Sequence, residues 1–174
     1  AERIERAGVL DRAAAALTAG VRGALRRRGA ADLLHGVPFG QPAHPPLVQL
    51  PIGCWASAAL LDLVPGTSRA SRLLIAAGIA GAAPAAAAGL ADWSELHREQ
   101  QRVGFVHAAS GAMATALYSA SLLARAAGRD WDGKLLSFGG LTAAAAGGYL
   151  GGHLVGLGLT SSETRLILVR EHAR

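Results

Sequence analysis

Three histidines and one aspartate are the residues of this chain whose types and positions could do chemistry. They stand near the ends of four successive apolar stretches, as His44, Asp92, His107 and His153. Imidazole nitrogens suit haem iron, zinc, copper and nickel, and a carboxylate can bind a metal or accept the N–H of a ligand histidine. Because successive helices of an up-down bundle alternate in direction, these side chains are expected to meet at one end of the bundle. The pattern predicts a metal, haem or proton site there.

The four residues allow more than one kind of site. A haem iron with two axial histidines would use His44 and His107, whose helices lie diagonally in such a bundle, and the Ala- and Gly-rich faces of the other two helices would leave room for the macrocycle. A single transition-metal ion bound by all three histidines and the aspartate fits nearly as well. His107 with His153 is a third pairing. The residues lack the tight spacing of a dedicated metal motif, so each histidine could instead be a neutral core residue bonded to a carbonyl, and Asp92 could cap its loop or pair with an arginine.

The elements that must position these residues are four long apolar helices. Between residues 47 and 159 the charges stand almost entirely in three short connectors. The stretches that remain cover residues 47–64, 73–91, 103–124 and 135–159, close to the roughly 20 residues that cross a bilayer as a helix. None has the polar stripe of a soluble amphipathic helix. We expect an all-α fold, an integral membrane four-helix up-down bundle over residues 35–160.

The residues that flank this bundle differ from it. Residues 1–34 have arginines on several faces and an apolar residue at every third or fourth position, namely Leu10, Ala14, Leu17, Val21 and Leu25. This pattern predicts an amphipathic helix that lies in the headgroup region of the membrane, with packing on a partner subunit as the alternative. Residues 161–174 are expected to form a basic tail. The chain lacks an initiator Met, which predicts a processed or partial protein.

The opposite end of the bundle is expected to hold an ion pair. Asp62 should lie near Arg69, Arg72 and Arg125 there, and we interpret it as a structural anchor. Positive charge over the whole chain is in excess on the side that holds both termini, which predicts cytoplasmic termini. The expected location is therefore the bacterial inner membrane, crossed several times.

Composition excludes several classes of function. The net charge is +5, but there is no basic surface interleaved with aromatics, so we expect no nucleic-acid partner. Cys54 is the only cysteine, which excludes an iron–sulfur centre held by cysteines of this chain alone. No nucleophile arrangement, phosphate-binding loop or acid/base carboxylate pair is present. Enzymatic turnover by this chain alone is therefore not expected.

Several segments together resemble an uncharacterised bacterial family of predicted four-helix membrane proteins, domain of unknown function 2231. They are residues 40–48 (GQPAHPPLV), 51–53, 89–93 (GLADW), His107 and 148–155 (GYLGGHLV). The resemblance spans residues 35–160. In this family the position of Gln41 is often histidine, so one possible ligand is missing here. Similar domains often precede a Rieske-type iron–sulfur domain, which implies a redox partner, although this chain has no Cys-x-His pair.

Three functions remain in competition. The leading hypothesis is a membrane electron-transfer subunit that holds a b-type haem between histidines and exchanges electrons with a quinone and a Rieske-type or other redox partner. The second is a non-catalytic anchor or assembly subunit of a larger complex, with no cofactor. The third is a metal- or proton-linked transporter, which the scarcity of polar residues in the middle of the bundle disfavours.

Overall fold

The computed structural model describes residues 2–25 and 28–172, with side chains over 3–23, at 25 and over 31–154. The described residues form helices and connecting turns, without a strand. Four long helices make up most of the fold: α4 (His44–Leu61), α5 (Ser68–Ser94), α6 (Arg98–Ala126) and α7 (Asp130–His172). Short helices precede them: α1 (Glu2–Glu5), η1 (Gly8–Leu10), α2 (Asp11–Ala24), α3 (Arg28–Leu34) and η2 (Val37–Phe39).

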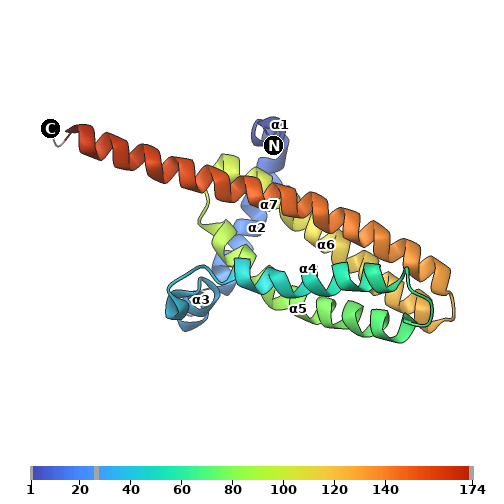
Figure 1. Cartoon of the computed structure of the whole chain (residues 1–174). Helices are drawn as coiled ribbons and strands as arrows, with labels where there is room; N and C mark the ends of the chain where they lie inside the picture. Colours follow the sequence, from blue (N-terminus) through green and yellow to red (C-terminus); the bar gives the residue numbers. More distant parts are fainter. Residues whose placement is uncertain (1, 26–27, 173–174) are drawn as a thin grey trace.

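The four long helices run up and down beside one another (Figure 1). α4 packs against α5 and α7, and α6 packs against the same two helices. α4 and α6 are therefore the diagonal pair, as the sequence predicted. The hairpin turns α4–α5 and α6–α7 lie at one end of the bundle, and the α5–α6 turn lies at the other end with α1, α2 and α3 (Figure 1).

The helices extend further than the apolar stretches that predicted them. α5 begins at Ser68 instead of residue 73, and α6 begins at Arg98 instead of residue 103. α7 continues to His172, through most of the expected tail. Arginine, glutamate and glutamine are good helix formers, so a helix continues beyond its apolar part into charged sequence.

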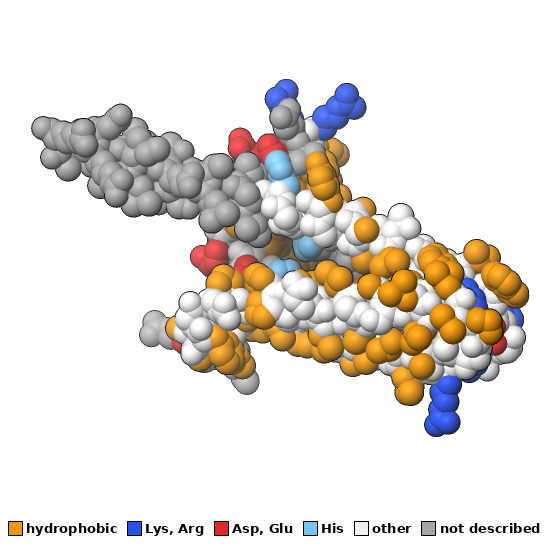
Figure 2. All heavy atoms as spheres, viewed as in Figure 1, with side chains coloured by type: hydrophobic (Ala, Val, Ile, Leu, Met, Phe, Trp, Pro, Cys, Tyr) orange, Lys and Arg blue, Asp and Glu red, His pale blue; other side chains and the backbone are white. Residues whose placement is uncertain are grey.

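The interior of the bundle consists of small, aromatic and polar side chains. Its central cluster consists of Trp55, Ala58, Ile75, Ala114 and Tyr118. Several serines are also fully buried, whereas large aliphatic side chains on the long helices are exposed, among them Leu50, Leu60, Leu73, Leu123 and Leu135. Figure 2 shows hydrophobic side chains spread along the outside of the bundle. Soluble monomers rarely expose an apolar surface of this extent, and it suits contact with lipid.

Four membrane spans were expected, and one helix in the described part of the chain passes a test of length and hydropathy for crossing a membrane. This helix is α5. His44, Gln49 and three prolines lower the hydropathy of α4, and histidine, serine, threonine and tyrosine side chains lower that of the apolar part of α6. The four-helix bundle is thus observed, with α5 as its candidate span among the described residues.

The N-terminal helices differ from the single amphipathic helix expected over residues 1–34. The segment forms α1, η1, α2 and α3 in succession. α2 packs on the end of the bundle, where Arg22 Nη2 donates to the carbonyl oxygen of Ser94 at 2.7 Å and Arg102 Nε donates to Asp11 Oδ1 at 2.6 Å. Ala14, from the predicted apolar face, is buried. This face therefore packs at least partly within its own chain.

The docking of α2 is expected to weaken at low pH. The hydrogen bond from Arg102 lowers the pKa of Asp11 below its ordinary value of 3.8. Because the folded-state pKa is the lower one, this contribution to docking is complete above pH 3.8 and is lost as the pH falls through the folded-state pKa. A nitroxide spin label at the exposed Ala16 should gain mobility as the pH falls from 6 to 2.5. In Asp11→Asn the label should be more mobile at pH 6 and respond little to acid; an equal acid response in both proteins would contradict this.

Candidate functional site

Two of the predicted residues, His44 and His107, come together inside the bundle. His44 is the first residue of α4, and His107 lies in the third turn of α6. Their ring centres are 6.0 Å apart and the ring planes are perpendicular. Both side chains are half-buried. Figure 2 shows histidine side chains in the hollow between the α4–α5 and α6–α7 halves, at the end opposite the hairpin turns.

Each ring is fixed by a hydrogen bond to the next helix in the chain. Nδ1 of His44 lies 2.8 Å from the carbonyl oxygen of Ala85, and Nδ1 of His107 lies 2.7 Å from that of Gly147. A carbonyl oxygen only accepts, so Nδ1 must carry the proton in both rings. In the neutral form Nε2 is then unprotonated and keeps its lone pair. A histidine that binds a metal usually has this arrangement, with its other N–H on a carbonyl or carboxylate.

Two glycines make room for these rings. A Cβ atom added to Gly89 would lie 2.8 Å from the Cε1 and Nδ1 atoms of His44, and one added to Gly151 would lie 3.0 Å from Cε1 of His107. Each glycine follows the anchoring carbonyl by four residues, one helical turn later. The Gly-rich segment near His153 is therefore where the His107 ring is seated.

The two imidazoles are the candidate ligands of a shared metal ion. The two ring centres are 6.0 Å apart. Each ring is held through Nδ1 by a carbonyl, so the two Nε2 atoms would be the atoms that hold a metal ion or a haem iron. The macrocycle would need the hollow between the two halves to widen, since Ala85 and Ala88 are buried.

The other two predicted residues have different partners. Asp92 Oδ1 lies 3.0 Å from Nδ1 of His35, and Nε2 of His153 lies 2.8 Å from Oε1 of Glu5. Over the residues that the structure describes, no three His, Cys, Asp or Glu side chains converge on a possible metal position. The arrangement considered from sequence, one ion held by three histidines and Asp92, is thus not formed. The N-terminal segment explains this, because it supplies Glu5 and His35 as competing partners.

Sequence reasoning gave His35 no role and did not consider Glu5. The pairs that they form join residues 57 and 148 positions apart. No spacing rule connects such distant positions.

The far end of the bundle holds the predicted ion pair, fully buried. Arg125 Nη2 lies 2.5 Å from Asp62 Oδ2, and Arg125 Nη1 donates to Asp62 Oδ1 at 2.8 Å. Ser71 donates to Asp62 at 2.7 Å, and Arg125 also donates to the hydroxyls of Ser121 and Ser137. The interpretation of Asp62 as an ion-pair anchor is confirmed, with Arg125 as the partner among the three arginines considered.

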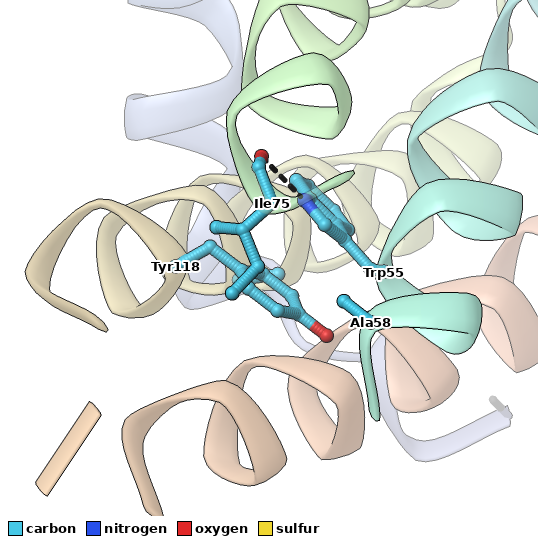
Figure 3. Packing of buried hydrophobic residues seen from close by; sticks show 5 residues of the cluster. Trp55, Ala58, Ile75 and Tyr118 are labelled. Carbon is cyan, nitrogen blue, oxygen red and sulfur yellow. Dashed lines mark hydrogen bonds between the residues drawn. The ribbon is translucent and has the colours of Figure 1, made fainter. Parts of the chain in front are cut away.

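An aromatic pair lies between the histidines and this ion pair. The rings of Trp55 and Tyr118 stack with centres 4.4 Å apart, and Trp55 Nε1 donates to the carbonyl oxygen of Ile75 (Figure 3). The Tyr118 hydroxyl is buried without a hydrogen-bond partner among the described residues. The interior between α4 and α6 is thus occupied in turn by two imidazoles, two aromatic rings and an ion pair.

Comparison with known proteins places the chain by its family. No curated protein and no solved structure matches it. A family model described as "Predicted membrane protein (DUF2231)" matches residues 40–162. This region covers α4, α5, α6 and much of α7, and includes both facing histidines. The chain therefore belongs to the DUF2231 family of predicted membrane proteins.

Proposed function

We propose that this chain is an integral membrane electron-transfer subunit that binds a b-type haem between His44 and His107. The observation that carries the proposal is the facing pair of rings, 6.0 Å apart, each with Nδ1 on a carbonyl and Nε2 left as a ligand. The haem would supply reversible one-electron transfer. The protein's own residues would hold the rings at a fixed distance and orientation and limit the access of water.

In this proposal all four long helices cross the bilayer. Support comes from the exposed leucines along the bundle and from a polar, aromatic interior that lipid could not solvate. In hydrocarbon, polar side chains face the interior and pair with one another, as Asp62 and Arg125 do. The excess of arginine on the side of the termini favours cytoplasmic termini in a bacterial inner membrane, with the histidine pair near that face.

Electrons would pass between a quinone and a protein partner such as a Rieske-type protein. A haem close to one membrane face is within reach of a docked protein. α2 carries exposed Arg12 and Arg22 beside the end of the bundle that holds the histidines. This basic surface would attract an acidic patch on the partner.

The absorption spectrum of the purified protein tests the proposal. Protein expressed with sufficient haem should show a Soret band that shifts on reduction with dithionite. His107→Ala should abolish the band, and His44→Ala should remove or strongly weaken it, because each change deletes one of the two histidines that would hold the haem. His97→Ala, at an exposed position at the start of α6, is the matched control and should keep the spectrum. A folded, colourless wild-type protein that takes up no haem would overturn the proposal.

A non-catalytic anchor is the second candidate, favoured by a specific observation. The bonds His44 to Ala85 and His107 to Gly147 join α4 to α5 and α6 to α7, so the histidines also act as structural links between helices. Under this function His107→Ala would lower stability and leave any partner's activity intact. Deletion of residues 1–30 would release the partner.

A further inference from the structure

The two helical hairpins of the bundle match each other position by position. Adding 63 to a residue number in α4 gives its counterpart in α6, and adding 62 in α5 gives its counterpart in α7. His44 corresponds to His107 and Gly89 to Gly151 in this way, and the anchoring carbonyl of Ala85 corresponds to that of Gly147. The histidine, its hydrogen-bond acceptor and its glycine are therefore repeated as a unit.

The correspondence continues away from the histidines. Trp55 and Tyr118, each eleven residues after its histidine, pack on Gly78 and Gly140, each eleven residues before its ring-seating glycine. The hairpin turns contain Gly66 and Gly128, both with positive φ, at +82° and +77°. These pairs keep the same offsets of 63 and 62.

The exposed fraction of side chains on the outer surface repeats with the same offsets of 63 and 62. Leu50 and Met113 are 56% and 57% exposed, Leu60 and Leu123 are 68% and 72% exposed, and Leu73 and Leu135 are 65% and 66% exposed. The match therefore includes the outer surface as well as the core. Few residue types are shared, so the repeat is visible mainly in the structure.

Counterparts on α4 and α6 also touch each other. His44 faces His107, Trp55 stacks on Tyr118, and Asp62 binds Arg125. Equivalent residues of two repeats meet in this way only near a two-fold axis, as at the interface of a symmetric dimer. Identical charges facing each other at the axis would repel, which accounts for an aspartate opposite an arginine at that level.

We propose that the bundle is a duplicated helical hairpin and that His44 with Gly89 and His107 with Gly151 are two equivalent half-sites of one two-fold-symmetric site. This proposal rests on the proposed function and names its ligand class. The ligand is a metal centre on the axis that takes two identical imidazole donors, and each chain binds one such centre. Gly89 and Gly151 are its positioning residues, because they seat the rings without touching the metal. An ion with four different protein ligands does not fit such an axis.

The duplication can be tested without any ligand by an exchange across the axis. The variant Trp55→Tyr with Tyr118→Trp places each ring in the counterpart environment, which offers the equivalent glycine, Gly78 or Gly140. Its melting temperature in detergent should be close to that of the wild type, whereas Trp55→Tyr alone and Tyr118→Trp alone should both melt lower. An exchange variant less stable than both single variants would overturn the duplication.

Hemin titration tests the half-sites. Wild-type protein should bind one hemin per chain. Gly89→Ala should weaken binding about 10-fold to 100-fold, the range for residues that orient a ligand histidine, and Gly151→Ala should weaken it less because its added Cβ is less crowded. Gly152→Ala, with nothing within 4 Å of an added Cβ, is the control and should bind normally.

The outcomes separate the two proposals. Two hemins per chain, or unchanged binding by folded Gly89→Ala and Gly151→Ala, would overturn the symmetric site while haem binding stands. A successful exchange variant with no hemin bound by wild type would overturn the proposed function and the ligand class, and would leave the duplication supported. Should Gly89→Ala fail to fold, the milder Gly151→Ala decides the test.

Discussion

Arg125→Ala is expected to lower the free energy of unfolding by about 3–5 kcal/mol. The side chains of Arg125 and Asp62 are both fully buried. Removal of the guanidinium leaves the Asp62 carboxylate buried, with Ser71 as its one remaining side-chain donor among the described residues. Leaving one member of a buried ion pair without its partner costs more than the intact pair contributes. Chemical unfolding in detergent micelles, followed by circular dichroism, measures the change.

A surface arginine and a double variant serve as controls for this prediction. Arg129→Ala removes an exposed pair with Asp132, and should change stability by less than about 1 kcal/mol. Asp62→Leu combined with Arg125→Met replaces both charges with apolar groups and should recover most of the stability. An Arg125→Ala protein within 1 kcal/mol of wild type would show that this pair does not hold the bundle together.

Gly78→Ala is expected to lower the stability by about 1–3 kcal/mol, the usual cost of overpacking a core. An added Cβ would overlap the Trp55 indole at its Nε1 edge. The indole must then move, which breaks its hydrogen bond to Ile75 and its stack on Tyr118. The expected result opposes helix propensity, since alanine is favoured over glycine by about 1 kcal/mol in an unhindered helix. Thermal unfolding and near-ultraviolet circular dichroism report stability and ring packing.

Gly53→Ala separates these two effects. Gly53 is also in a long helix, but nothing lies within 4 Å of an added Cβ. This variant should therefore be as stable as wild type or more stable. Equal behaviour of Gly53→Ala and Gly78→Ala would mean that the indole does not occupy the space over Gly78.

Much of the bundle could be predicted from sequence because long apolar helices with short connectors leave few arrangements. The order of the four helices, the diagonal placement of α4 and α6, and the end at which His44 and His107 meet all follow from alternating direction. Asp62 was predicted as an ion-pair anchor for the same reason, since the hairpin turns bring arginines to its end of the bundle. Helix ends were predicted less well, because hydropathy detects the apolar part of a helix and not its polar first and last turns.

The remainder of the site depended on the N-terminal segment, which the sequence placed in the headgroup region. Docking of this segment on the bundle brings Glu5 to His153 and His35 to Asp92. Such contacts depend on the angle at which short helices pack, and periodicity does not determine that angle. The repeat between hairpins was also hidden, because it preserves size and position at Trp55 and Tyr118 and gives opposite charges at Asp62 and Arg125.

The length of α7 has a mechanical consequence. Its 43 residues rise about 1.5 Å each and measure roughly 65 Å, about twice the 30 Å of bilayer hydrocarbon. The second half of α7 extends beyond the end of the bundle that carries the N-terminal helices (Figure 1). Because α7 is one unbroken helix, displacement of its outer end by a docked protein would also move Gly147 and Gly151, which contact the imidazole of His107.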